Sequence, residues 1–333
     1  MRPLFALLVC LIANPVLAAE VIGFKEISLP APRPLHVAMW YPAAGGTARL
    51  IADTRVFNGF TAVPGAGLAD GPHPLVVLSH GYGGNWTNQD WLAAALAGQG
   101  YIVAAPNHPG TTTGDMATPG VSMLGERPRD VSRVIDAVLA TASVPAGRIA
   151  VIGHSLGGWT SLEIAGARFD RATLQAACTA APSRTCGEVG AHAGMSEPML
   201  EDAHGDPRVR AAVALDPGVT RGFASASLAR VQVPLLVIAA GSPVIDLPGS
   251  TALPVPDLRE APDLVAQLPA ATTRLLTLPG ATHYSFLPVC KPSAAALLGG
   301  EAVICQDAPS ADRAALQRQV LDAVTPFLAA ALQ

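Results

Sequence analysis

Residues 148–166 read RIAVIGHSLGGWTSLEIAG, and the order of residue types in this stretch decides the fold. A short β-branched run comes first, then Gly-His-Ser-Leu-Gly-Gly, then apolar residues at helical spacing. A serine between glycines, where a strand gives way to a helix, is typical either of an ordinary tight turn or of a nucleophile on a strained turn. The chain has 32 glycines, so the pattern can arise by chance, and the surrounding sequence has to decide.

Apolar runs and helical patterns alternate on both sides of this stretch. Continuous apolar runs of this length are typical of strands buried on both faces of a parallel sheet. The strand candidates are 74–81, 101–110, 148–153, 209–216, 233–241 and 273–280. The helix candidates are 85–100, 127–141, 155–167, about 259–268 and 310–331. The alternation predicts an α/β fold with a mostly parallel, doubly wound sheet flanked by helices.

Two further segments fall outside the alternation. Residues 21–30 and 34–42 read as amphipathic strands, and we expect them to form an antiparallel pair at the sheet edge. Residues from about 168 to 208 have no clear period and contain two of the cysteines, which indicates a short insertion or cap. No internal repeat or long linker divides the chain, so residues 20–333 are expected to form a single domain.

The first nineteen residues, MRPLFALLVCLIANPVLAA, have a positive start, an apolar centre and small residues before position 20. This pattern predicts a secretory signal peptide, since it is too short for a comfortable membrane span. We therefore expect a periplasmic or secreted protein with no transmembrane span after cleavage. The formal charge of −4 and the lack of a basic block argue against nucleic acid as a partner.

Four cysteines remain after the predicted leader: Cys178, Cys186, Cys290 and Cys305. An even number in an exported chain suggests disulfides, and four cysteines allow three pairings. Local pairing of Cys178 with Cys186 and of Cys290 with Cys305 is the one we favour. Free thiols or a metal site are the alternatives, but no Cys-x-x-Cys pair or neighbouring histidine cluster supports a metal. We predict no metal and no cofactor.

Ser155 follows a predicted parallel strand and opens a predicted helix, which is where ligands bind in open α/β sheets. Gly153 and Gly157 are expected to be needed because a sharp turn leaves no room for Cβ atoms. A serine nucleophile requires a histidine base and an acid that orients it. His283, just after the last strand candidate, is the predicted base. His108 is a candidate for lining the pocket.

The remaining histidines read as structural. His80 and His154 adjoin glycine turns and are expected to shape them, and the others read as surface or loop residues.

Two acids compete for the third position because both follow strands between Ser155 and His283. Asp216 ends the run VRAAVALD, directly at a strand's carboxyl end. Asp246 lies several residues beyond the next strand and would need a loop that folds back. Asp216 is favoured because an acid directly at the strand end can contact the histidine without a loop that folds back. Asp246 remains the alternative.

Acyl transfer also requires hydrogen-bond donors for the oxyanion that forms in the transition state. One donor is expected to be the backbone amide of Leu156, the residue after the nucleophile. The other is expected from the glycine-rich loop after the strand in PLVVLSHGYGG, where the amide of Tyr82 is the candidate. The alternative reading of that loop is a simple tight connection.

Five motifs in this order together carry a family resemblance: PLVVLSHGYGG, GQGYIVAAPNHPG, GHSLGG, VALD and GATHYSF. The chain resembles the dienelactone hydrolase-related and platelet-activating-factor acetylhydrolase-like branch of the α/β-hydrolase fold, over about residues 30–290. The resemblance implies Ser155 as nucleophile, His283 as base, and Leu156 and Tyr82 as oxyanion donors. Asp216 matches the acid of acetylhydrolase-like members.

Two positions depart from the family. Many dienelactone hydrolases place the acid after the next strand, where this chain has AAGSPVID without an acid directly after AAG, which supports Asp216 and leaves Asp246 open. True dienelactone hydrolases use a cysteine nucleophile, so the serine at 155 argues against that activity. The implied function is a serine hydrolase that cleaves carboxylic esters, with a small-molecule or lipid-like substrate, through an acyl-enzyme. A serine peptidase on the same fold and a non-catalytic binding protein on a hydrolase scaffold are the alternatives.

Overall fold

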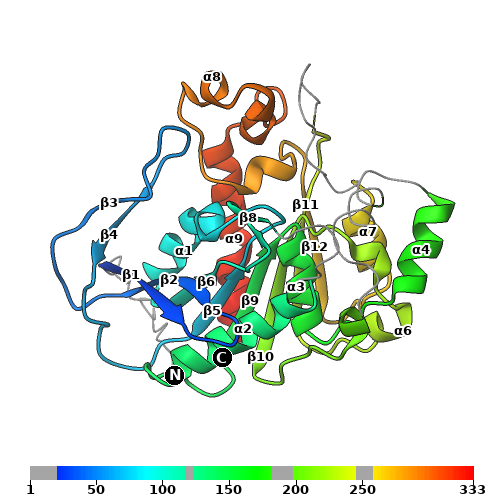
Figure 1. Ribbon diagram of the computed structural model, residues 1–333, viewed down its shortest axis with the longest axis horizontal. Helices are drawn as coiled ribbons and strands as arrows, with labels where there is room; N and C mark the ends of the chain where they lie inside the picture. Colours follow the sequence, from blue (N-terminus) through cyan, green and yellow to red (C-terminus); the bar gives the residue numbers. More distant parts are fainter. Residues whose placement is uncertain (1–20, 117–123, 182–185, 187–197, 245–257) are drawn as a thin grey trace, which may run out of the picture.

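The computed structural model describes residues 21–116, 124–181, 186, 198–244 and 258–333. Its centre is a ten-stranded sheet with the order β12-β11-β10-β9-β5-β6-β2-β1-β4-β3 (Figure 1). The strands of this sheet are β1 Ile22–Leu29, β2 Leu35–Pro42, β3 Arg49–Ile51, β4 Phe60–Pro64, β5 Leu75–Ser79, β6 Ile102–Pro106, β9 Ile149–His154, β10 Val209–Leu215, β11 Leu235–Ala240 and β12 Thr273–Leu278. The predicted α/β class is confirmed.

The six apolar runs form six neighbouring strands that pair in parallel with one another, β5, β6 and β9 to β12. Strand β5 lies between β6 and β9, so the chain leaves β5 on one side and returns on the other. This reversal is the switch point at which open α/β sheets bind ligands, outside the carboxyl ends of the strands. The turns that follow β5 and β9 both begin there.

Strands β1 and β2 form the predicted antiparallel pair, but the prediction that they lie at the sheet edge is wrong. Strand β4 pairs in parallel with β1, and β3 pairs with β4 to make the actual edge. Both added strands are short, and the exposed β3 carries no alternation of apolar and polar residues. A small separate hairpin, β7 Thr111–Thr112 and β8 Asp115–Met116, lies beside the turn after β5.

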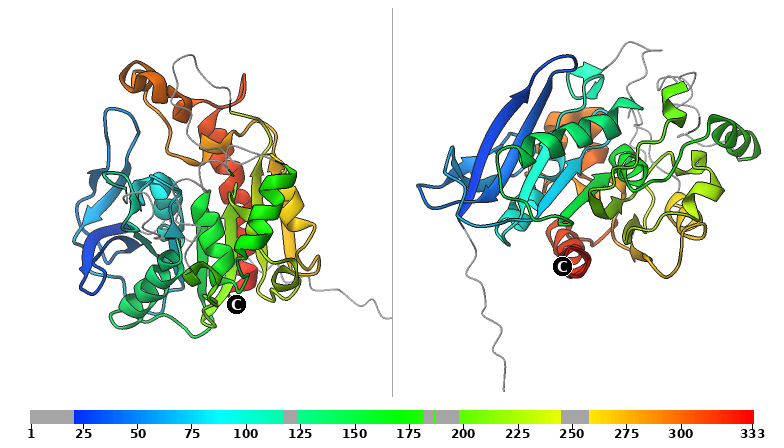
Figure 2. Two further views of the ribbon diagram at one scale, coloured as in Figure 1. Left: turned by 45° about the vertical axis from the view of Figure 1, so that its right-hand side comes forward. Right: turned by 90° about the horizontal axis from the view of Figure 1, so that it is seen from below.

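Helices cover both faces of the sheet, as the views in Figure 2 show. The α-helices are α1 Asp90–Ala97, α2 Glu126–Leu139, α3 Leu156–Ile164, α4 Arg171–Ala180, α6 Ser225–Leu228, α7 Glu260–Val265, α8 Ala294–Leu298 and α9 Arg313–Ala331. The 3-10 helices are η1 Trp86–Gln89, η2 Pro198–Glu201, η3 Thr220–Gly222, η4 His283–Phe286 and η5 Gly299–Cys305. Within the described ranges, no helix is both long enough and apolar enough to cross a bilayer.

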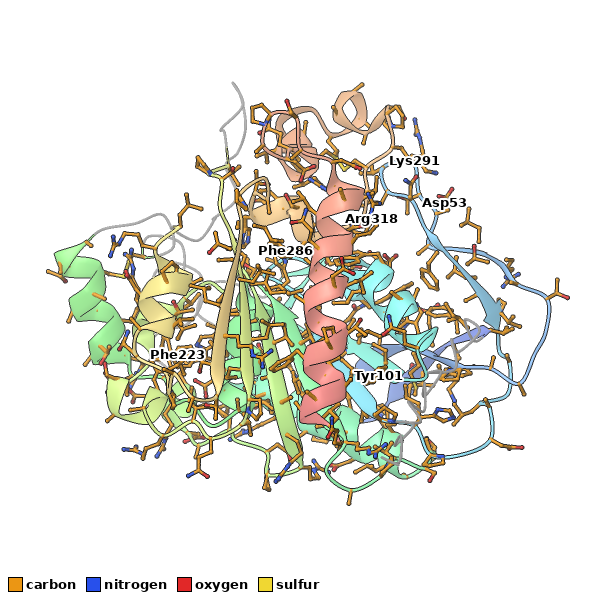
Figure 3. All side chains as sticks on the ribbon, turned by 180° about the vertical axis from the view of Figure 1, so that it is seen from behind. Asp53, Tyr101, Phe223, Phe286, Lys291 and Arg318 are labelled. Carbon is orange, nitrogen blue, oxygen red and sulfur yellow. A yellow bond between two sulfur atoms is a disulfide. The ribbon has the colours of Figure 1, made fainter. Side chains whose placement is uncertain are left out.

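Each helix layer has its own core. Apolar side chains of α1 and α9 pack on one sheet face with Trp40, Val76 and Ile152. Those of α2 pack on the opposite face, where α3 and α7 extend the same layer toward β10 and β11. Figure 3 shows α9 lying along the sheet from behind. Burial of these large apolar surfaces is the main favourable contribution to folding.

The predicted insertion contains α4 and η2, and the cysteine pair Cys178–Cys186 joins the end of α4 to the chain that follows. Cys290 and Cys305 form the second disulfide, across α8 and η5. The predicted local pairing is therefore confirmed. Residues 1–19, predicted as the leader, lie outside the described residues.

The long loop between β3 and β4 folds onto the segment that holds the second disulfide. Lys291 Nζ lies 2.6 Å from an Asp53 carboxylate oxygen, and the two side chains are adjacent in Figure 3. Backbone bonds reinforce this contact, since the Asn58 amide donates to the Val289 carbonyl at 2.9 Å.

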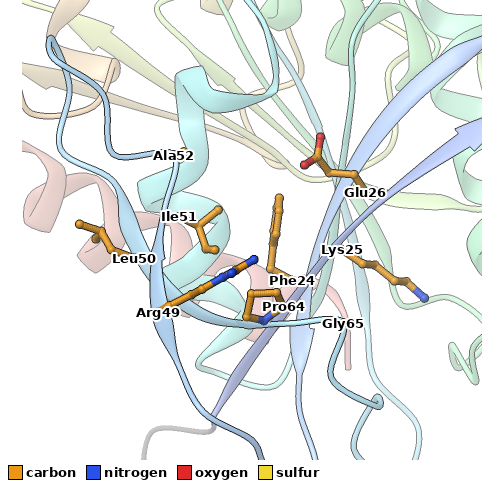
Figure 4. A pocket seen from close by; sticks show the side chains of 9 residues that line it. All are labelled: Phe24, Lys25, Glu26, Arg49, Leu50, Ile51, Ala52, Pro64 and Gly65. Carbon is orange, nitrogen blue, oxygen red and sulfur yellow. The ribbon is translucent and has the colours of Figure 1, made fainter.

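A hollow of about 480 Å³ lies where the loop leaves β3, lined by β1, β3 and β4 (Figure 4). It is separated from β9 by β5, β6 and β2, so it is remote from Ser155.

Asp90, the first residue of α1, is only 2% exposed, and burial raises the pKa of its carboxyl to about 8. Between its ordinary pKa of 3.8 and about 8, the unfolded chain releases this proton while the folded chain keeps it. Asp90 therefore costs stability that grows as pH rises through this window, by at most about 1.4 kcal/mol per pH unit.

We expect Asp90→Asn to unfold at a higher temperature than the wild type at pH 8, with the two proteins converging near pH 4. Asparagine has the same shape without the charge, and roughly 1–3 kcal/mol is the expected gain at pH 8. Thermal unfolding at pH 4, 6 and 8 measures it. Parallel melting curves at all three pH values would contradict the assignment.

Candidate active site

Ser155 stands alone between the end of β9 and the start of α3. Its φ of 56° and ψ of −120° lie in a region that non-glycine residues rarely adopt. A Cβ on Gly153 would come within 1.9 Å of the Gly157 carbonyl oxygen, and one on Gly157 within 1.8 Å of the Ser79 carbonyl oxygen. The predicted need for glycine at both positions is confirmed, and the turn that they permit presents the serine at the switch point.

His283 and Asp216 converge on this serine. The distance from His283 Nε2 to Ser155 Oγ is 3.0 Å, and that from His283 Nδ1 to Asp216 Oδ2 is 2.7 Å. The histidine is 4% exposed and the aspartate 6%. These distances and this order of groups match a serine activated by a histidine whose other nitrogen is held by a carboxylate. The structure thus brings together residues that are 128 positions apart in the chain.

Asp216 is held by the strand that follows it. Its φ is 41°, and its second carboxylate oxygen accepts a hydrogen bond from the Ala240 amide at 2.8 Å. Both oxygens are thereby fixed, one toward β11 and one toward His283. Asp246, the alternative acid, lies outside the described residues.

The predicted oxyanion donors lie on the two turns that meet at Ser155. Leu156 is the first residue of α3, and Tyr82 follows Gly81 in the turn after β5. A Cβ built on Gly81 would be 3.1 Å from Ser155 Cβ and 3.6 Å from its Oγ, so this turn touches the serine. The Tyr82 side chain is 40% exposed.

The loop that carries His283 is anchored by residues that the sequence patterns did not indicate. The Ser285 hydroxyl accepts the Thr282 amide at 2.8 Å and donates to the Asp307 carboxylate, which pairs with Arg313. Arg313 in turn donates to the Ile304 carbonyl at 2.9 Å, beside the Cys290–Cys305 disulfide. The disulfide therefore lies at the end of a polar chain that supports the His283 loop.

His154 supports the same loop from below. Its Nε2 donates to the His283 carbonyl at 2.9 Å, and its ring centre lies 4.7 Å from that of His283. Burial holds the pKa of His154 well below its usual range, with His283 as the second cause. His154 was predicted to shape the turn beside it, and in the structure its side chain also contacts the loop that carries His283.

Because of these contacts, we expect the two disulfides to differ in their effect on function. Opening either loop is expected to cost about 2.5–3 kcal/mol of stability, because the loops of 8 and 15 residues differ little in closure entropy. Cys290→Ser/Cys305→Ser should also lower the turnover of an ester substrate, whereas Cys178→Ser/Cys186→Ser should leave turnover near that of the wild type. Urea unfolding and initial rates at 20 °C measure the two effects, and equal rates for both variants would contradict the difference.

A second chain of the same residue types runs beneath the site. Ser79 Oγ lies 3.0 Å from His108 Nε2, and His108 Nδ1 lies 3.0 Å from an Asp130 carboxylate oxygen. All three side chains are 0% exposed, so no substrate reaches them. The prediction that His108 lines the pocket is wrong, since burial closes it off completely. Of these two chains, the one that starts at Ser155 has a partly exposed serine on a strained turn, and the one that starts at Ser79 is fully buried.

Arg127 closes this buried chain. It is 0% exposed and donates to Ser79 Oγ at 3.2 Å, to Thr111 Oγ1 at 2.7 Å and to Thr160 Oγ1 at 3.1 Å, as well as to the His80 carbonyl. One side chain thus joins α2 to the turn after β5, to β7 and to α3. In the sequence, Arg127 stands at the start of a predicted helix, and this position indicated only a structural role.

The tryptophans are packing residues. Trp86 lies in an aromatic cluster with Trp40 and Phe24, and Trp159 is 0% exposed. Among the described residues, no group of three or more histidine, cysteine, aspartate or glutamate side chains is arranged to hold a metal ion.

Comparison with known proteins agrees with this architecture. A family model described as "Serine aminopeptidase, S33" matches residues 70–194. A solved structure of a ferulic acid esterase from Streptomyces cinnamoneus superposes with a TM-score of 0.62 at 22% identity, covering 96% of this chain and 92% of that one. The chain has the α/β-hydrolase fold.

Two other proteins are similar to this chain. The structure of a dienelactone hydrolase-like promiscuous phosphotriesterase from metagenomic libraries superposes with a TM-score of 0.51 at 17% identity, covering 92% of this chain and 98% of that one. A bis(hydroxyethyl) terephthalate hydrolase from Streptomyces coelicolor is 31% identical over 143 residues, which is 40% of this chain and 42% of the relative. The chain thus spans less than half the length of the curated relatives that it matches. The resemblance carried by the five motifs is confirmed at the level of the α/β-hydrolase fold.

Proposed function

We propose that this α/β hydrolase is an exported serine esterase that cleaves carboxylic esters through an acyl-enzyme on Ser155. The single observation that carries the proposal is the unbroken chain from Ser155 Oγ through His283 to Asp216, with distances of 3.0 and 2.7 Å. The relatives named as ester hydrolases support the same reaction class. Export is supported by the leader pattern in residues 1–19 and by the two disulfides.

In the first half of the reaction, Ser155 Oγ attacks the ester carbonyl carbon while His283 Nε2 accepts the hydroxyl proton. The carbonyl oxygen becomes an oxyanion, which accepts hydrogen bonds from the amides of Tyr82 and Leu156. Asp216 holds His283 in the required tautomer and stabilises the imidazolium. The C–O bond to the alcohol then breaks, and His283 returns the proton to the departing alcohol.

In the second half, a water molecule attacks the acyl-serine with His283 again taking the proton. The tetrahedral intermediate collapses, the acid leaves, and Ser155 recovers its hydrogen. Every proton transferred in this cycle moves through His283 Nε2, so the proposed reaction requires no cofactor to supply or accept protons.

The substrate class is best proposed as a small ester with an accessible carbonyl. Tyr82 follows Gly81, the residue whose turn touches Ser155, and it is 40% exposed, so we expect its ring to offer a flat apolar surface to the acyl group of the substrate. The bis(hydroxyethyl) terephthalate hydrolase and the ferulic acid esterase are both named for aromatic acids, and aromatic acyl groups are therefore the first candidates here.

A peptidase activity is the second candidate because the matching family model is described as a serine aminopeptidase. The two activities are separated by one comparison on the purified mature protein. We expect p-nitrophenyl butyrate and p-nitrophenyl benzoate to be hydrolysed with a kcat/KM at least about 10³-fold above that of aminoacyl p-nitroanilides, a gap within the usual spread of enzyme efficiencies. Faster anilide cleavage would favour the peptidase, and no turnover of any substrate would favour a non-catalytic protein.

A further inference from the structure

His80 lies between β5 and the turn that carries Tyr82, and its ring is almost completely buried. Its Nδ1 is 2.7 Å from the carbonyl oxygen of Gly81, the next residue in the chain. Its Nε2 accepts a hydrogen bond from the backbone amide of His108 at 3.1 Å. The ring therefore bridges two backbone segments, one of which is the turn beside Ser155.

The backbone donor identifies the tautomer of this histidine. An amide nitrogen only donates, so Nε2 must present a lone pair to the His108 amide and cannot carry a proton. The hydrogen of the neutral ring is then on Nδ1, where it donates to the Gly81 carbonyl. Thr112 Oγ1 also lies 3.1 Å from Nε2, and it donates to the His108 carbonyl at 2.7 Å.

Burial and nearby charged and polar groups keep the His80 ring neutral. Burial lowers the pKa of His80 well below its usual range, and the Arg127 guanidinium and His108 lower it further. Arg127 donates to the carbonyl of His80 itself, and the pKa of His108 is lowered by burial in the same way. Asp130, the carboxylate of this cluster, is occupied by His108 and Arg33. His80 is thus a fixed donor at Nδ1 across the pH range in which His283 has to act.

The bond that His80 donates acts on one particular peptide group. The Gly81 carbonyl belongs to the Gly81–Tyr82 peptide, whose N–H is the second oxyanion donor of the proposed mechanism. A peptide group is planar, with its C=O and N–H pointing in opposite directions, so fixing the carbonyl also aims the amide. The same carbonyl accepts the Gly84 amide at 3.1 Å, and hydrogen bonds at one end of a peptide strengthen donation at the other.

We propose that His80 is a positioning residue that aims and polarises the Gly81–Tyr82 peptide, so that the Tyr82 amide stabilises the oxyanion formed on Ser155. The inference rests on the proposed esterase function and adds a specific device to it. Arg127 completes the device, because it joins this turn to Thr160 on α3, the helix that begins with the other donor, Leu156. The spacing of the two donors is thereby set by buried side chains that touch no substrate.

Two substitutions separate the two ring nitrogens. In His80→Asn the side-chain amide replaces Nδ1–H and keeps the bond to the Gly81 carbonyl. In His80→Gln the longer side chain places its carbonyl oxygen near Nε2, which keeps the His108 contact and loses the Gly81 contact. We expect His80→Gln to lose about 10- to 100-fold in kcat, less than the loss of an entire oxyanion donor, with KM changed less than about threefold. His80→Asn should stay within about fivefold of the wild-type kcat.

The decisive readout compares an aryl ester with its thiono analogue, in which sulfur replaces the carbonyl oxygen. Sulfur accepts hydrogen bonds poorly, so a wild-type esterase with an aimed amide prefers the oxygen ester, and His80→Gln should reduce that preference while His80→Asn retains it. A merely structural role would lower both rates together. An unchanged preference in His80→Gln, in a protein in which the wild type hydrolyses the ester, overturns the inference and leaves the esterase function standing; no turnover by the wild type contradicts the function itself.

A measurement on the unmodified protein covers the case in which the glutamine variant does not fold. Nitrogen-15 NMR of the histidine rings distinguishes a protonated nitrogen from one with a lone pair. We expect His80 to have a protonated Nδ1 and an unprotonated Nε2 from pH 6 to pH 8. A ring protonated on Nε2 overturns the inference, because such a ring has no hydrogen to donate to Gly81.

Discussion

Replacing Ser155 by alanine is expected to lower ester turnover by roughly 10⁴- to 10⁶-fold and to abolish labelling by a fluorophosphonate probe. The loss follows from the proposed mechanism, in which His283 Nε2, 3.0 Å from Ser155 Oγ, activates this serine as the nucleophile. Alanine keeps the Cβ that the strained turn already accommodates, so we expect the fold to be unchanged. Initial rates and gel fluorescence of the labelled protein measure the two effects.

Ser79→Ala is the matched control for this experiment. Ser79 also lies 3.0 Å from a histidine that contacts a carboxylate, but it is 0% exposed. We expect this variant to keep the fluorophosphonate label and to lose about 1–3 kcal/mol of stability, because Arg127 and His108 lose a buried partner. Loss of the label in Ser79→Ala together with its retention in Ser155→Ala would reverse the assignment of the nucleophile.

Replacing Asp216 by asparagine is expected to lower kcat by about 10⁴-fold with little change in KM. An asparagine amide in place of Oδ2 donates to the histidine, so it favours the tautomer of His283 that has no lone pair available for Ser155. Asparagine is the suitable replacement because it tolerates the positive φ of 41° at this position better than most residues. Steady-state kinetics with a p-nitrophenyl ester measure the loss.

Asp246→Asn is the control that tests the other acid. We expect it to hydrolyse the same ester at nearly the wild-type rate, because the carboxylate that contacts His283 belongs to Asp216. Circular dichroism of both variants confirms that each is folded before the rates are compared. A folded Asp246→Asn without activity, beside an active Asp216→Asn, would transfer the acid's role to Asp246.

The parallel half of the fold was predictable because burial on both faces leaves an unambiguous pattern. Strands β5, β9 and β11 are apolar at every position except the terminal Ser79 and His154, and helix patterns separate them from one another. The β3–β4 edge was missed for the opposite reason: β3 has two exposed residues and one partly exposed residue, and β4 ends in a proline. Such strands form because neighbouring strands pair with them. The residues of the strand itself carry no pattern that predicts this pairing.

The residues of the site also fall into those that the sequence could predict and those that it could not. Ser155 and Asp216 follow directly from the strands that precede them, and Gly153 and Gly157 indicate the turn, so the principal residues could be predicted from their position at strand ends. The buried residues that support the site could not be predicted in this way. His80, His108 and Arg127 come from three separate segments, and each one alone reads as a turn or helix residue. Their role depends on distances that arise only when β5, β6 and α2 are packed together.

The central claim is an acyl-enzyme on Ser155, and rapid quenching tests it most directly. The mature protein is mixed with excess p-nitrophenyl benzoate, quenched in acid within milliseconds, digested and mapped by mass spectrometry. We predict one benzoyl group per chain, on the peptide that contains GHSLGG, with the modified residue sequenced as Ser155. Ester turnover without acylation of Ser155, or acylation at another residue, would contradict the account.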